Sequence, residues 1–87
     1  MLEGREFTIY SVKDELTGLF LQPMFIQSEG EALRIFEHMV NTNGIWKSNA
    51  GQFNLFKLGT FNEKTGISDY NTPELVQGGT TVVTERS

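Results

Sequence analysis

The feature that most constrains this 87-residue chain is one helix-forming stretch, SEGEALRIFEHMVN, at positions 28–41. Ser28 is the expected N-cap and Glu31 its partner three residues later, a capping box worth roughly 1 kcal/mol. Asn43 and Gly44 are expected to end the helix, with Gly in the left-handed position. The apolar residues that share one stripe of this helix are Ala32, Leu33, Phe36, Met39 and Val40. A single stripe of this kind predicts that the helix covers one flat apolar surface.

The residues before the helix alternate as strands do. The elements expected there are a strand at 6–12, a polar turn at 13–18 and a second strand at 19–27. In the first strand, Phe7 and Ile9 share one face, while Tyr10 and Val12 share the other. Pro23 indicates that the second strand is an edge or contains a bulge, because Pro cannot donate to a ladder. The two strands are expected to pair as a hairpin.

The residues after the helix return to strand patterns. The elements expected there are a loop at 45–51, a strand at 52–61, a Gly-containing turn at 62–66, the start of a return strand at 67–70, a loop at 71–79 and a β-branched strand at 80–84. Phe53 and Leu55 share one face of the strand at 52–61, and Phe56 and Leu58 share the other. The predicted fold class is α+β. An antiparallel sheet of four to five strands carries one helix packed on one face, in β-β-α-β-β order, within a single domain at 1–87.

A sheet covered by one helix has a second face that must meet water, a partner subunit or a ligand. Tyr10, Phe56, Leu58 and Phe20 are expected on that face. Apolar groups gathered on an open face usually mark an interaction site. The sequence therefore directs attention to binding by the sheet.

Composition limits the classes of function. The chain has no Cys, which fits a reducing compartment and excludes thiolate chemistry. Its net charge is −4, and its seven Lys and Arg residues are scattered, so tight non-specific binding of duplex DNA is not expected. No apolar run approaches the ~18 residues of a membrane span, and the charged beginning does not resemble a signal peptide. The expected location is the cytosol.

The sequence lacks the motifs of an enzyme. Its one His, His38, lies on the predicted helix with no metal-ligand spacing around it, and it is interpreted as a solvated helix residue. No P-loop or calcium loop is present. We expect no cofactor, no metal and no catalytic activity; a small enzyme would require a pocket around His38.

Three groups of residues are candidates for binding instead. Trp46 and Lys47 put an aromatic ring beside a cation, which can stack a base and neutralise a phosphate, or Trp46 closes the end of the core. Tyr10, Phe56 and Lys57 form either a stacking platform for single strands or the seam of a dimer.

Arg34 is the third candidate. It is either a surface ion-pair partner of Glu31, Glu37 or the neighbours of His38, which contributes little, or a contact to a phosphate or a partner. The residues that the patterns themselves select for binding nucleic acid or a partner are Tyr10, Arg34, Trp46, Lys47, Phe56 and Lys57.

The middle of the chain resembles a viral protein family. The residues that carry the resemblance are YSVKD at 10–14, Pro23 and Phe25, the S-x-x-E-A-x-R-x-F helix at 28–36, FNLFKLGTF at 53–61, and Thr65 with Gly66. In this order they are similar to the small nonstructural protein of gokushovirus-type microviruses, which are single-stranded DNA bacteriophages. The resemblance covers residues 7–76 and does not extend to the C-terminal QGGTTVVTERS.

The resemblance implies a nonstructural role in viral DNA synthesis or packaging, in the host cytoplasm, with DNA as the expected ligand. The family pattern also carries Lys13 and Arg34, so the resemblance adds Lys13 to the residues expected to bind nucleic acid or a partner. The acidic balance of this chain departs from a plain DNA-binding protein. Two hypotheses follow. In the first, the protein binds single-stranded DNA through aromatic and basic groups on one sheet face. In the second, it is a homodimer that recruits a viral or host replication protein and touches no DNA.

Overall fold

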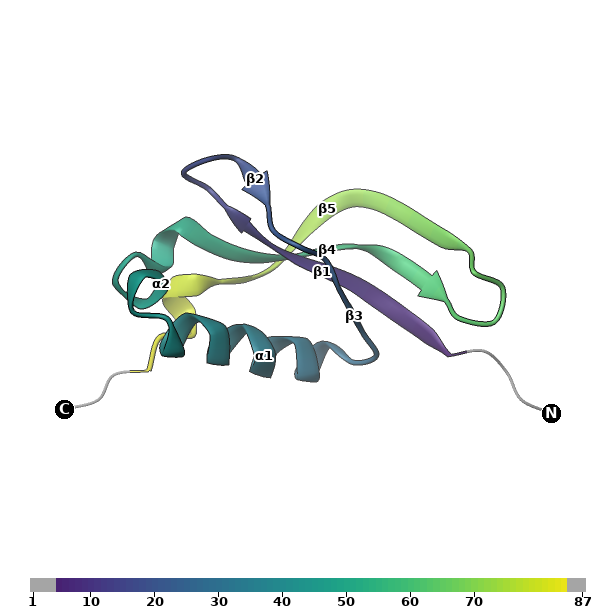
Figure 1. The fold of residues 1–87 in the computed structure, drawn as a ribbon, viewed down its shortest axis with the longest axis horizontal. Coiled ribbons are helices and arrows are strands. Elements are labelled where there is room, and N and C mark those ends of the chain that lie inside the picture. The colour runs from purple at the N-terminus through teal and green to yellow at the C-terminus, as the bar shows by residue number, and fades with distance from the viewer. Residues whose placement is uncertain (1–4, 85–87) are drawn as a thin grey trace.

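Five antiparallel strands and one main helix form the fold over residues 5–84, the part of the chain that the computed structural model describes (Figure 1). The central strand β1 (Glu6–Asp14) pairs on one side with β2 (Leu19–Phe20) and β3 (Met24–Ile26). On its other side it pairs with β4 (Phe53–Asn62), which pairs with β5 (Ser68–Gly78). The predicted fold class is confirmed.

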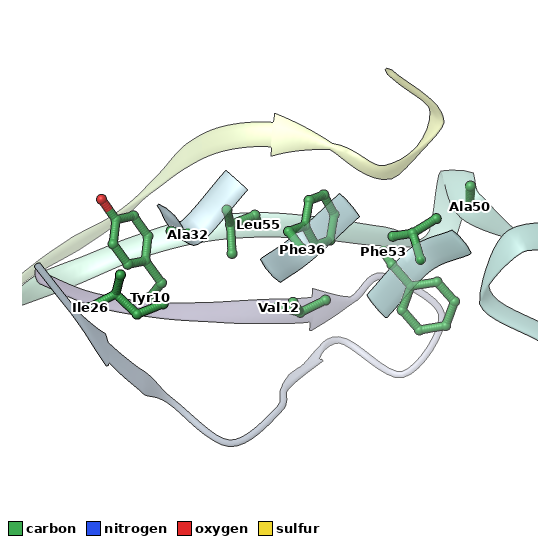
Figure 2. Packing of buried hydrophobic residues seen from close by; sticks show 9 residues of the cluster. Tyr10, Val12, Ile26, Ala32, Phe36, Ala50, Phe53 and Leu55 are labelled. Atoms are coloured by element: carbon green, nitrogen blue, oxygen red, sulfur yellow. The ribbon is translucent and has the colours of Figure 1, made fainter. Parts of the chain in front are cut away.

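The helix α1 (Glu29–Thr42) covers one side of this sheet (Figure 1). Ser28 caps it as expected, because the Ser28 Oγ accepts a hydrogen bond of 3.2 Å from the Glu31 amide. Ala32, Phe36 and Val40 are completely buried. The core between helix and sheet, most of it drawn in Figure 2, consists of Tyr10, Val12, Ile26, Ala32, Phe36, Val40, Ala50, Phe53 and Leu55.

The segment at 45–51, predicted to be a loop, is instead mostly helical. It contains a short helix α2 (Gly44–Ser48) and a 3₁₀ turn η1 (Ala50–Gln52). Asn43 begins α2 rather than only ending α1, because its Oδ1 accepts hydrogen bonds from the Ile45 and Trp46 amides at 3.0 and 3.2 Å. The predicted left-handed Gly cap is wrong, since positive φ occurs within residues 5–84 only at Gly18 and Gly66.

Those two glycines lie in the predicted turns at 13–18 and 62–66. Gly18 has φ 76° and Gly66 has φ 74°, a region that L side chains rarely adopt. The predicted strand at 19–27 is split into β2 and β3 near Pro23, which agrees with the expected interruption. The connection between them is fixed to the sheet, because the buried Ser11 Oγ donates to the Leu21 carbonyl at 2.6 Å.

The C-terminal part differs from the prediction in two places. The predicted loop at 71–79 belongs largely to β5, an edge strand in which the missing amide of Pro73 is tolerated. The predicted strand at 80–84 is wrong. It is a 3₁₀ turn η2 (Gly79–Thr81) followed by an irregular end.

Core packing and hydrogen bonds from the Asn41 side chain, together called the Asn41 clasp, explain why the β-branched run at 80–84 does not form a strand. Val82 and Val83 pack against the core. The Asn41 Nδ2 donates to the Val82 carbonyl at 2.9 Å, and the Asn41 Oδ1 accepts from the Thr84 amide at 2.8 Å. The end of the described chain is thereby held on α1 rather than on the sheet.

The strands β4 and β5 approach each other closely at Gly59. A Cβ added there would lie 2.0 Å from the Asp69 carbonyl oxygen and 2.9 Å from the Tyr70 Cα. Both are backbone atoms, so no side-chain movement can relieve the contact. In the same region Leu58 is left unpaired, because the register of β4 shifts against both neighbouring strands.

We predict that Gly59→Ala lowers the free energy of unfolding by roughly 1–3 kcal/mol, because the methyl group forces β5 away from β4. Gly30→Ala is the matched control, since nothing lies within 4 Å of its Cβ position. On α1 that change should raise stability by up to about 1 kcal/mol through helix propensity. Urea unfolding, followed by the fluorescence of Trp46, measures the free energy of unfolding of each variant. Equal changes in the two variants contradict the prediction.

Candidate nucleic-acid interface

The side of the sheet away from α1 carries a row of aromatic residues. Residues directly opposite each other on antiparallel strands share a face. Phe7 lies opposite Phe61 on this side, and Ser11 lies opposite Phe56. The other pairs place two further rings there, since Ile9 faces Phe25 and Lys13 faces Phe20. We call this surface the aromatic face, defined by Phe7, Phe20, Phe25, Phe56 and Phe61.

The aromatic face is ordered by ring contacts. Phe20 and Phe56 meet edge to face, with centroids 5.5 Å apart and planes at 76°. Phe25 and Phe61 repeat this arrangement at 5.5 Å and 84°. Edge-to-face pairs are worth about 0.5–1.5 kcal/mol each beyond the area they bury. The rings are therefore held in place without a covering helix.

The same rings remain partly open to solvent. Phe20 is 38% exposed and Phe25 is 49% exposed, whereas Ile9 at the middle of the face is 1% exposed. The adjoining strand β5 adds Leu75 opposite Phe56 and Tyr70 opposite Gly59, at 58% and 66% exposure. Such a face offers apolar and aromatic surface to a ligand.

A cation lies at each end of the aromatic face. The Lys13 Nζ is 5.6 Å from the Phe20 ring centroid and 6.0 Å from that of Phe56. The Arg5 guanidinium carbon is 5.5 Å from the Phe7 ring centroid. Both positions are within the range of cation–π attraction.

Each of these cations also has a carboxylate partner. The Glu15 Oε1 is 3.5 Å from the Lys13 Nζ, and the Glu63 Oε2 accepts from the Arg5 Nε at 3.1 Å. The hydrogen bond from Arg5 lowers the pKa of Glu63 below its usual value, so Glu63 is ionised at neutral pH. The two ends of the face are therefore nearly neutral in charge.

Tyr10 is not on this surface, and its expected placement beside Phe56 is wrong. It is 2% exposed and lies in the core between the sheet and α1 (Figure 2). On the neighbouring strand it lies opposite Lys57, whereas Phe56 lies opposite Ser11. Alternation separated the two sides of β1 correctly but did not show which side the helix covers. Lys57 shares the side of Tyr10, so the predicted platform of Tyr10, Phe56 and Lys57 does not form.

The remaining candidates lie away from the aromatic face. Trp46 stacks on Phe53 with centroids 4.3 Å apart and planes at 9°, and it packs against the core, as the alternative interpretation of Trp46 required. Lys47 is half-buried on α2. Arg34 is exposed on α1 beside His38, and it forms no ion pair within residues 5–84, so its predicted pairing with Glu31 or Glu37 is wrong.

Sequence reasoning missed Phe25, Phe61 and Arg5 as members of the site. Phe56 and Phe61 are five residues apart, so simple alternation assigns them to opposite faces. The bulge at Leu58 inserts one extra residue and returns both rings to the same face. Gly59 was a sequence signal that could have found this irregularity, because an isolated Gly inside a strand pattern often marks a bulge or a close approach of backbones.

Within residues 5–84, no group of three or more His, Cys, Asp or Glu side chains is placed to hold a metal ion. No helix in the same part of the chain is long and apolar enough to cross a membrane.

The described residues thus form a small α+β fold in which one face of the sheet is covered by a helix and the other is lined with paired aromatic rings. The family model for Phage ORF5 protein matches residues 7–82, and the chain belongs to this phage protein family. No match was found among curated proteins or among solved structures.

We predict a late ionisation of Tyr10. Burial raises the pKa of its hydroxyl above 10.0, the Glu29 carboxylate raises it further, and Thr8 partly offsets both. In the unfolded chain this tyrosine loses its proton first, so stability falls as pH rises above about 10. Tyr10→Phe should remove this part of the alkaline loss, as measured by urea unfolding at several pH values. Identical pH dependence in the two proteins contradicts the prediction.

Proposed function

We propose that this protein is a non-enzymatic nonstructural protein of a gokushovirus-type phage that assists viral DNA replication or packaging in the host cytoplasm by binding single-stranded DNA. The observation that carries the proposal is the aromatic face, with two ordered ring pairs and a cation at each end. Membership of a phage protein family is consistent with this role.

Single strands suit this surface better than duplex DNA. Unpaired bases can stack on exposed rings, and stacking contributes about 1–3 kcal/mol per base without reading sequence. Duplex binding depends mainly on many phosphate contacts, which a chain of net charge −4 does not supply. Phe20 and Phe25 are the most exposed of the five rings and would receive the bases first.

Phosphate contacts would come from Lys13 and Arg5. Glu15 and Glu63 must release these cations for a phosphate to take their place. The net gain is small, because one anionic partner replaces another in an exposed setting. Stacking therefore supplies most of the affinity, and binding depends only weakly on salt.

One observation favours a second candidate, a homodimeric module that recruits a viral or host replication protein and does not contact DNA. The carboxylates that neutralise both ends of the aromatic face would repel a phosphate backbone, but they would suit a protein surface. The two candidates differ in whether an oligonucleotide binds at all.

We predict that Phe25→Ala weakens binding of a fluorescent oligothymidylate about fivefold or more, because one stacking ring is lost. Ile45→Ala is the matched control, since Ile45 is 73% exposed on α2 and lies away from the aromatic face. It should leave the dissociation constant unchanged. Fluorescence anisotropy titration measures both variants. Equal affinity of the two, or no binding by the wild-type chain, contradicts the proposal.

We predict that Glu15→Gln strengthens binding of the same oligonucleotide, because Lys13 becomes free to neutralise a phosphate. The slope of log affinity against log salt should steepen by up to about 0.7, the value for one phosphate contact on a single strand. Glu37→Gln on the exposed side of α1 changes the net charge equally and should have no such effect. Anisotropy titrations at several salt concentrations separate a local effect of Glu15 from a general effect of charge.

A further inference from the structure

We propose that the aromatic face is also the contact surface of a homodimer, and that a single strand displaces the second copy from it. The proposal of a dimer does not depend on DNA binding, whereas the displacement of the second copy by DNA rests on the proposed function. The starting observation is the exposure of Phe20, Phe25, Tyr70 and Leu75 on this one side of the sheet. Joined apolar surface of this kind on a small protein marks an interaction site.

The edges of the sheet do not offer an alternative route to a dimer. The outer strand β5 contains Pro73, which cannot donate to a ladder, and the acids Asp69 and Glu74, which add negative charge to both sides of any pairing of this edge with its copy. The opposite edge is broken between β2 and β3, at the segment that contains Pro23. A second copy must therefore use a face of the sheet rather than an edge.

The charges at the ends of the aromatic face suit a second copy of the same chain. Each end has one cation and one carboxylate, Arg5 with Glu63 and Lys13 with Glu15. In a two-fold dimer the aromatic face of one copy packs on the aromatic face of the other. Whichever ends of the two faces meet, the cation of one copy can pair with the carboxylate of the other. No charge of like sign is left without a counterpart, whereas a phosphate backbone would meet Glu15 and Glu63 unfavourably.

The two faces of the sheet differ in what they offer a partner. One face is covered by α1, whose outward residues Arg34, Glu37 and His38 are exposed and polar. The aromatic face carries exposed apolar side chains instead, so it is the face of the described sheet that suits an apolar contact with a second copy.

The dimer and the DNA complex compete for the same rings. In the dimer, the rings of each copy cover those of the other, so no base can stack on Phe20 or Phe25. A single strand that binds one copy must separate the pair. The dimer is therefore a form of the protein that cannot bind DNA until it dissociates. Because dimerisation increases with protein concentration, the fraction of chains that can bind DNA falls as the concentration rises.

The first arm of the test measures native mass by sedimentation equilibrium over the widest attainable range of concentrations. The wild-type chain and Ile45→Glu should both be dimers, and Phe25→Glu, which places a charge in the contact, should be a monomer. Leu75→Glu is a second variant at the same surface, and circular dichroism confirms that each variant folds. A wild-type chain that stays monomeric, or folded Phe25→Glu and Leu75→Glu variants that both remain dimeric, overturns the inference.

The second arm adds a short labelled oligothymidylate to the wild-type dimer and measures the mass of the complex. One chain per oligonucleotide is the expected result and supports displacement. Two chains on one short oligonucleotide overturn displacement, because the rings would then be open in the dimer. A dimer that binds no oligonucleotide contradicts the proposed function and leaves the dimer standing. A monomer that binds it contradicts the dimer and leaves the proposed function standing.

Discussion

The packing of α1 on one side of β1 and β4 is the contact on which the rest of the structure depends. Ala32, Phe36 and Val40 are fully buried there against Leu55 and its neighbours. A chain of this length has one helix long enough to make such a core, so the second side of the sheet must be stabilised by its own side chains. The two edge-to-face phenylalanine pairs meet that need. The rings that stabilise the sheet are therefore also the rings that it presents to a partner.

The sequence was sufficient to predict the class of fold, because its strongest signals are local. Helical periodicity with Ser28 as N-cap gave α1. Glycines at positive φ marked the turns at Gly18 and Gly66, and alternation marked the long strands. Asn43 shows where such signals become ambiguous, because the same side chain that follows one helix also caps the next. The Pro73 segment was predicted as a loop for a related reason, since Pro is excluded from central strands but not from an edge.

The binding surface was harder to predict than the fold, because it depends on contacts between distant segments. Alternation shows which residues of a strand share a side, but only pairing in three dimensions shows which side the helix covers. Tyr10 was misplaced for this reason. The bulge at Leu58 moved Phe61 to the side of Phe56, and its one neighbouring signal was Gly59, which indicates a bulge without showing how the strands pair around it. The carboxylates beside Lys13 and Arg5 were equally hidden, because Glu63 lies 58 positions after Arg5.

The clasp at Asn41 has a consequence for the order of folding. Its side chain binds Val82 and Thr84, which follow it by 41 and 43 positions, so the contact closes a large loop of chain. Closing a loop of that length lowers the entropy of the chain before the hydrogen bonds can form. Contacts of this kind therefore form after local ones. We therefore expect α1 and the hairpin of β4 and β5 to be assembled first. The chain end would then be fastened last, as the step that completes the core.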